Sequence, residues 1–110
     1  MVFEQLKQKK HPTNSTFDKI YPKLYQEHSA RHFTPVNIAI KAAKLLVDKP
    51  TDKILDIGSG VGKFCCIGAS VTEAHFYGVE KRKTLTNLSN KIKRNYKLKN
   101  AHFINNDFTT

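Results

Sequence analysis

Residues 54–64 read Ile-Leu-Asp-Ile-Gly-Ser-Gly-Val-Gly-Lys-Phe, and they are the most informative part of the sequence about its fold. The first part of this stretch is a short apolar run closed by glycines, which is typical of a buried strand in a parallel sheet. Three glycines follow at alternate positions, and the pattern after Gly62 is helical. Glycine adopts positive φ and lets a ligand approach the backbone closely. The stretch therefore predicts a strand, a tight glycine turn and a helix, as in the nucleotide sites of open α/β sheets.

Asp56 lies inside the apolar run, near the carboxyl end of the predicted strand. A carboxylate is costly to bury unless something pairs with it, so this position calls for a reason. The glycines have the spacing G-x-G-x-G, whereas dinucleotide-binding proteins have G-x-G-x-x-G. This difference disfavours a nicotinamide-dinucleotide enzyme. The remaining alternative to a ligand site is a purely structural turn between strand and helix.

Two further strands are predicted, and an acid stands at or after the end of each. Residues 75–80, His-Phe-Tyr-Gly-Val-Glu, form the second strand, and Glu80 follows Gly60 by twenty residues. An acid at about this distance can accept hydrogen bonds from both hydroxyls of a ribose. The alternative is an ordinary strand-terminal acid that pairs with Lys81 or Arg82. Residues 101–104 form the third strand, and Asp107 follows it.

Helices are predicted between and before these strands. Thr34 is a good N-cap and Pro35 suits the first helical position, so an amphipathic helix should start there and end by residue 49. A second helix is expected over residues 62–70, and a third over residues 83–97 with its basic side chains outward.

The first 32 residues are predicted to form a polar, basic, helical arm. Residues 1–16 contain few apolar anchors. A helix around residues 17–25 should be capped by Ser15 or Thr16 and interrupted at Pro22. His28 and His32 are four residues apart, but no third ligand lies nearby, so no metal site is predicted.

The net charge is +10 over 110 residues, a length that suits one domain. Between Lys81 and Lys99 there are basic residues and no acid, which indicates a solvated helix face or, alternatively, a surface for nucleic acid or an acidic protein. No apolar run is long enough to span a membrane and no signal-peptide core is present, so a cytoplasmic location without a membrane partner is expected. Cys65 and Cys66 are adjacent, and neighbouring cysteines do not readily form a disulfide with each other. We therefore expect both to serve as small residues of a helix, with at least one of them buried.

The first motif resembles D-x-G-x-G-x-G of class I S-adenosylmethionine (SAM) dependent methyltransferases. Residues 56–62, 77–81 and 107–108 are similar to the Dot-type histone-lysine methyltransferases within that superfamily. The resemblance implies an α/β fold, namely a Rossmann-like three-layer sandwich with a parallel sheet. The complete fold of the superfamily has seven strands, and this chain would supply its N-terminal half. It implies a truncated SAM-binding domain at residues 33–110 after the arm at residues 1–32. The implied activity is methyl transfer from SAM to an unidentified acceptor, with protein lysine as a candidate; a non-catalytic basic module that binds nucleic acid is the alternative.

The resemblance also implies which residues bind the cofactor. Thr34 would border the methionine end, Asp56 would help to hold the cationic end, and Glu80 would bind the ribose. Asp107 and Phe108 would border the adenine. The full expected set is Thr34, Asp56, Gly58, Ser59, Gly60, Gly62, Glu80, Lys81, Asp107 and Phe108. No catalytic base is assigned, because the sequence stops before a fourth strand, and the exposed sheet edge suggests a homodimer.

Overall fold

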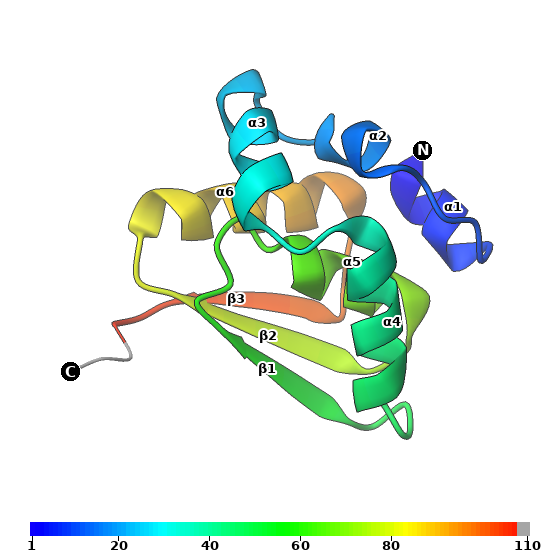
Figure 1. The fold of residues 1–110 in the computed structure, drawn as a ribbon. Helices are drawn as coiled ribbons and strands as arrows, with labels where there is room; N and C mark the ends of the chain where they lie inside the picture. The colour runs from blue at the N-terminus through cyan, green and yellow to red at the C-terminus, as the bar shows by residue number, and fades with distance from the viewer. Residues whose placement is uncertain (108–110) are drawn as a thin grey trace.

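The computed structural model describes residues 1–107, apart from the side chains of residues 30 and 31. Three parallel strands form a sheet in the order β1-β2-β3, and Figure 1 shows the helices gathered on one side of it. The expected α/β class with a parallel sheet is confirmed. The elements are α1 (Val2–Lys7), α2 (Asn14–Asp18), α3 (Lys23–His32), α4 (Val36–Leu46), β1 (Lys53–Ile57), α5 (Lys63–Val71), β2 (His75–Glu80), α6 (Lys83–Tyr96) and β3 (Ala101–Asn105).

The strand order explains why the helices share one face. Helix α5 connects β1 to β2 and α6 connects β2 to β3, and both connections step across the sheet in the same direction. Because such crossovers are right-handed, both helices come to lie on the same face. Residues 1–107 therefore contribute the sheet and one helical layer of the expected three-layer sandwich (Figure 1).

Strand β1 is not the buried strand that its sequence predicts. It lies at the edge of the sheet, and Leu55 and Ile57 are 60% and 54% exposed on the face without helices. Ile104 of β3 is 47% exposed on the same face, in register with Val79. An apolar run indicates that a strand is suited to burial, but whether the strand is buried depends on what packs against it. The homodimer through this edge stays a prediction.

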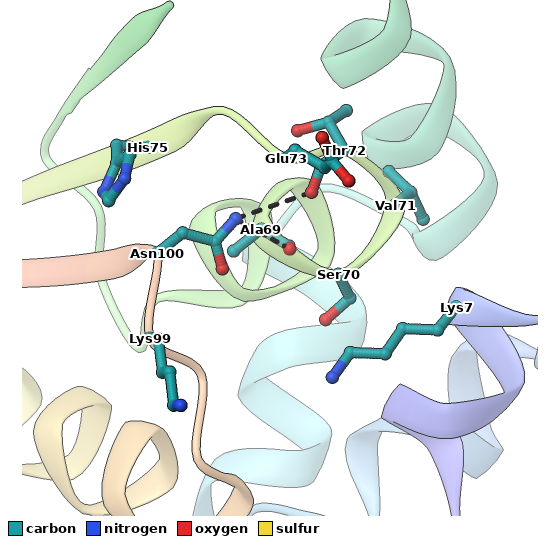
Figure 2. A pocket seen from close by; sticks show the side chains of 9 residues that line it. All are labelled: Lys7, Ala69, Ser70, Val71, Thr72, Glu73, His75, Lys99 and Asn100. Carbon is teal, nitrogen blue, oxygen red and sulfur yellow. Dashed lines mark hydrogen bonds between the residues drawn. The ribbon is translucent and has the colours of Figure 1, made fainter. Parts of the chain in front are cut away.

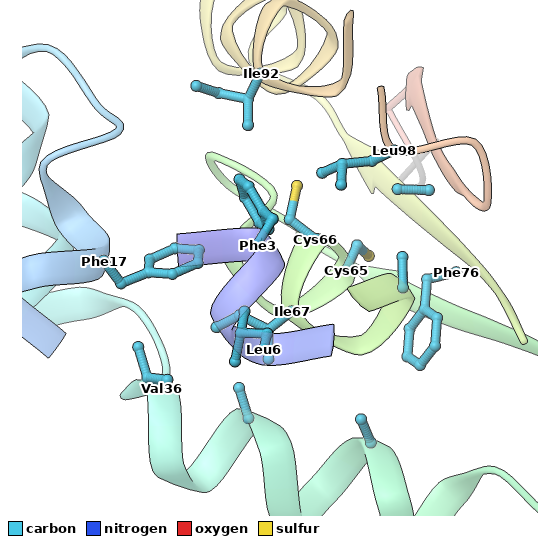
Figure 3. Packing of buried hydrophobic residues seen from close by; sticks show 14 of the residues in the cluster. Phe3, Leu6, Phe17, Val36, Cys65, Cys66, Ile67, Phe76, Ile92 and Leu98 are labelled. Carbon is cyan, nitrogen blue, oxygen red and sulfur yellow. The ribbon is translucent and has the colours of Figure 1, made fainter. Parts of the chain in front are cut away.

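The core lies around α5, whose residues Cys65, Cys66 and Ile67 are fully buried (Figure 3). Both thiols are therefore buried, which confirms the expected packing role, and burial raises the pKa of Cys66 to about 12. The expectation of few apolar anchors in residues 1–16 is wrong. Phe3 is 1% exposed, and its ring centroid lies 5.5 Å from that of Phe17. The short helix α1 thus packs into the same core as α5.

Two helix starts differ from the predicted ones. Thr13, not Ser15 or Thr16, caps α2 by accepting a hydrogen bond from the Thr16 backbone N–H at 3.2 Å. The interruption at Pro22 is confirmed, because α2 ends before it and α3 begins after it. The start of α4 contains a further correction: Thr34 makes no capping bond. The Val36 N–H of α4 instead donates to Asn14 Oδ1 at 3.2 Å, so the arm caps this helix.

Replacing Gly68 with alanine should destabilise the protein by about 1–3 kcal/mol, which is typical of overpacking. A Cβ at Gly68 would lie 2.3 Å from Cε2 of Phe76, a fully buried ring on β2. The clash outweighs the gain of about 1 kcal/mol that alanine offers in a helix. Urea unfolding followed by circular dichroism measures the change. Ala69→Gly, the next position, is the comparison variant, because it removes a buried methyl group from the same helix instead of adding one. A Gly68→Ala variant as stable as the wild type would contradict the prediction.

Candidate functional site

The loop between β1 and α5 needs glycine for its backbone conformation. Gly58, Gly60 and Gly62 have φ values of 78°, 59° and 80°, which side-chain-bearing residues rarely adopt. A Cβ at Gly60 would lie 2.5 Å from Phe33 Cε1, and a Cβ at Gly62 would lie 2.7 Å from Phe103 Cε1. The predicted tight glycine turn is confirmed. Gly60 faces the segment before α4, whereas Gly62 packs against β3.

The glycine loop is hydrogen-bonded to the carboxyl end of β2. The backbone N–H groups of Gly58 and Ser59 donate to the Val79 carbonyl at 2.7 and 3.1 Å. The Gly60 N–H donates to Oε1 of Glu80 at 2.9 Å, and Glu80 is 2% exposed. The acid that closes the second strand and the loop that follows the first strand thus form one rigid unit.

Glu80 also pairs with Arg82, as the alternative interpretation of this acid expects. Arg82 Nε donates to Oε2 at 2.8 Å, Nη2 donates to Oε1 at 3.3 Å, and the Arg82 backbone N–H donates to Oε2 at 3.0 Å. The bonds from the Arg82 side chain, above all, lower the pKa of Glu80 to about 2. Glu80 is therefore ionised at neutral pH and accepts hydrogen bonds with both oxygens.

Asp56 lies at the neighbouring strand end, half-buried beside this unit. Burial raises the pKa of Asp56, and the negative charge of Glu80 raises it further. The negative charges of the two acids disfavour each other, so a positively charged group of a ligand would be stabilised beside Asp56.

A small cavity of about 120 Å³ opens at the glycine loop. It brings together four of the predicted residues, Thr34, Asp56, Gly58 and Ser59, and the aromatic ring of Phe33 also lines it. The Ser59 hydroxyl is buried and has no hydrogen-bond partner among the described residues. A buried polar atom without a partner is unusual, and a bound ligand or water commonly supplies one.

Gly60, Gly62 and Glu80 do not line this cavity, although they belong to the glycine loop and to the strand end bonded to it. The last three predicted residues follow β2 and β3. Lys81 is exposed, and its carbonyl accepts a hydrogen bond from Asn105 Nδ2 at 3.0 Å. Asp107 is exposed after β3, and Phe108 lies outside the described residues. Asn105, which sequence reasoning missed, also donates to the Glu80 carbonyl at 2.9 Å and so joins the ends of β2 and β3.

Lys63 is the most consequential residue that sequence reasoning missed. It is the first residue of α5, it is 1% exposed, and its Nζ lies 2.9 Å from Asp18 Oδ1. Nζ also donates to Asn14 Oδ1 and, at 3.3 Å, to Ser29 Oγ. These partners belong to α2 and α3, so the ion pair fastens the arm to the glycine loop. The sequence feature that could have indicated a buried role for Lys63 is its position between the last glycine and the apolar run Phe64–Ile67.

A larger hollow of about 520 Å³ lies at the opposite end of the sheet, near the start of β2 (Figure 2). Asn100 fixes its wall by donating to the carbonyls of Ala69, Thr72 and Ala74 at 2.9, 3.4 and 2.8 Å. Lys7 and Lys99 line it, but none of the predicted site residues does. Open α/β sheets bind ligands at the carboxyl ends of their strands, so this hollow is not the candidate site.

The described residues contain neither a group of three side chains placed to ligate a metal nor a helix suited to cross a membrane. The rings of His28 and His32 lie 4.4 Å apart, but within residues 1–107 no three His, Cys, Asp or Glu side chains converge as metal ligands. In the same residues, no helix is both long enough and apolar enough to cross a bilayer.

The parallel sheet, the glycine loop and the strand-end acid define a Rossmann-like α/β protein of the nucleotide-binding type. The sequence profile of the family described as "Methyltransferase domain" matches residues 48–110, more than half of the chain. The chain belongs to this family of methyltransferase domains. Among curated proteins, no sequence matches the chain significantly.

Several solved structures have a similar fold, and two of those described below are SAM-dependent methyltransferases. E. coli YjhP has 25% sequence identity and a TM-score of 0.61, and the match covers 78% of this chain and 37% of YjhP. A SAM-dependent methyltransferase from Thiobacillus denitrificans, in complex with S-adenosyl-L-homocysteine, has 20% identity and a TM-score of 0.60, over 79% of this chain and 37% of that protein. One from Geobacter sulfurreducens, with the same ligand, has 18% identity and a TM-score of 0.61, over the same shares. The chain thus spans little more than a third of each.

Proposed function

We propose that this chain binds SAM at the carboxyl ends of β1 and β2 and serves a methyl-transfer reaction. The observation that carries the proposal is the buried, ionised Glu80 bonded to the Gly60 N–H at 2.9 Å. Membership of the methyltransferase domain family supports it. The two similar proteins that contain S-adenosyl-L-homocysteine support the choice of ligand.

Each end of the cofactor has a chemically suitable partner in this site. Glu80 would accept hydrogen bonds from the ribose hydroxyls. Asp56, whose pKa is raised by burial and by Glu80, would gain from a nearby cationic group and would hold the methionine end together with Thr34. The unpartnered Ser59 hydroxyl offers a further hydrogen bond. Asp107 and Phe108 remain the predicted neighbours of the adenine.

The site must widen to admit this ligand. Its cavity holds about 120 Å³, whereas sites for ligands of this size hold about 300–1,000 Å³. The Phe33 ring stands against Gly60, and the Arg82 guanidinium covers Glu80. We expect both side chains to move when the cofactor enters.

When bound, SAM supplies a methyl group that is already activated by the adjoining sulfonium. The task of the residues described here is then to hold it in line with an acceptor and to exclude water, and such alignment lowers a barrier substantially. The acceptor and the group that deprotonates it are not assigned. A protein lysine, suggested by the similarity to Dot-type enzymes, stays a prediction.

The alternative function, nucleic-acid binding through the basic residues between Lys81 and Lys99, is weakened at Lys93. The ammonium group of Lys93 does not belong to a solvated face, since it donates to the Leu98 and Ala101 carbonyls. Burial accordingly lowers the pKa of Lys93. Lys91 and Arg94 stay exposed, so the alternative remains a prediction that salt-dependent binding to nucleic acid would test.

Isothermal titration of the folded chain with SAM, S-adenosyl-L-homocysteine and a nicotinamide dinucleotide tests the proposal. We expect saturable binding of the first two ligands and none of the dinucleotide. Circular dichroism beforehand establishes that the chain is folded. A folded chain that binds neither SAM nor its demethylated product, or that prefers the dinucleotide, would contradict the proposal.

A further inference from the structure

We infer that Arg82 is a gate on the candidate site: its guanidinium occupies the two positions on Glu80 that a ribose diol needs, and it must leave before a nucleoside binds. This inference rests on the proposed function, because it concerns the same carboxylate. The proposed function names residues that favour ligand binding, and this inference adds Arg82 as a residue that opposes it.

The acceptor capacity of Glu80 carries the argument. A carboxylate has two oxygens and about four lone-pair sites. Two sites are filled by backbone donors, the Gly60 N–H on Oε1 at 2.9 Å and the Arg82 N–H on Oε2 at 3.0 Å. The other two are filled by the guanidinium, with Nη2 on Oε1 at 3.3 Å and Nε on Oε2 at 2.8 Å.

A ribose diol would make the same pattern as the guanidinium, with one donor to each carboxylate oxygen. The backbone donors are fixed, because Gly60 belongs to the glycine loop and Arg82 is the N-cap of α6. The guanidinium is therefore the group that a diol displaces. Both cannot bind at once, because the carboxylate has no acceptor sites left.

The Arg82 side chain is free enough to move and has a place to go. It is 55% exposed, whereas the Glu80 side chain is 3% exposed. Arg82 also borders a hollow of about 440 Å³ between α3 and the start of α6, where Leu24, Tyr25 and His28 form the opposite wall. A guanidinium released into this hollow could lie against the Tyr25 ring, a favourable contact for a cation.

The test compares the affinity of wild type and Arg82→Met for S-adenosyl-L-homocysteine and for adenosine by calorimetry. Methionine keeps much of the side-chain stem but donates no hydrogen bond. We expect Arg82→Met to bind both ligands roughly three- to tenfold more tightly, because a half-exposed bidentate pair no longer has to be broken. Raising the ionic strength should tighten adenosine binding to wild type and leave Arg82→Met unchanged, since salt weakens the competing pair.

Lys83→Met is the matched control, because it removes one positive charge from the next, exposed residue without touching Glu80. If Arg82→Met binds no more tightly than wild type, or if Lys83→Met tightens binding equally, the gate is overturned and the proposed function survives. If folded wild type and folded Arg82→Met bind neither ligand, the proposed function fails and the gate fails with it.

A second measurement applies if Arg82→Met does not fold. The Nε–H resonance of Arg82 in ¹⁵N-labelled wild type reports its bond to Glu80. We expect this signal to shift when S-adenosyl-L-homocysteine saturates the site. An unchanged signal at saturation would overturn the gate.

Discussion

Replacing Lys63 with methionine is expected to lower the free energy of unfolding by about 3–5 kcal/mol, the usual effect of removing one partner of a buried ion pair. The Asp18 carboxylate, 3% exposed, would keep the Ser29 hydroxyl at 3.0 Å but would lose its counter-ion 2.9 Å away. Methionine nearly matches the volume of lysine, so the loss reports charge and hydrogen bonds more than a cavity. Urea unfolding followed by circular dichroism measures it.

Two variants make this prediction specific. Lys63→Met combined with Asp18→Leu removes both charges and should recover most of the lost stability, because apolar replacement of a buried pair is often neutral. Lys91→Met, at an exposed position of α6, should change stability by less than about 0.5 kcal/mol. A Lys63→Met variant within about 1 kcal/mol of wild type would show that this pair does not hold the arm.

Replacing Glu80 with glutamine is expected to weaken S-adenosyl-L-homocysteine binding by roughly 100-fold or more. Hydrogen bonds to a charged acceptor contribute about 1.5–3 kcal/mol each, and a ribose diol would lose the charge on both. Glutamine has nearly the same shape but one acceptor oxygen instead of two, and its amide would face the Gly60 N–H or the Arg82 N–H with the wrong polarity. Calorimetric titration of the variant and wild type measures the difference.

Glu73→Gln is the matched control, because this exposed acid lies beside the hollow at the other end of the sheet. Its affinity should equal that of wild type. Thermal unfolding of both variants shows whether the fold survives. An affinity of Glu80→Gln within threefold of wild type, in a folded protein, would remove Glu80 from the site.

The local elements could be predicted from the sequence because local patterns determine them. The glycine spacing after residues 54–57 predicts the loop, and the three positive φ values agree with it. The second strand, residues 75–80, has the predicted bounds. By contrast, the exposure of β1 depends on strand order and on what covers the sheet, which the residues of the strand do not specify.

The missed features are contacts between segments far apart in the chain. Asn14 caps α4 although it lies 22 residues before Val36 in the sequence. Lys63 of α5 pairs with Asp18 of α2, and α3, α4, β1 and the glycine loop lie between them in the sequence. A capping pattern at Thr34 suggested a local partner, but a tertiary one takes its place. For Glu80, the sequence offers the ribose role and the pairing with Lys81 or Arg82 as alternatives. The pairing is present, and it leaves the carboxylate bonded to the glycine loop as well.

The most direct test of the central claim is a map of the ligand on the ¹⁵N-labelled chain by NMR during titration with S-adenosyl-L-homocysteine. The proposed site predicts the largest amide shifts at Gly58, Gly60, Glu80 and Arg82, where the glycine loop meets the end of β2. Shifts concentrated instead around residues 69–73 and 99–100, at the larger hollow, would contradict a cofactor site at the carboxyl ends of the strands.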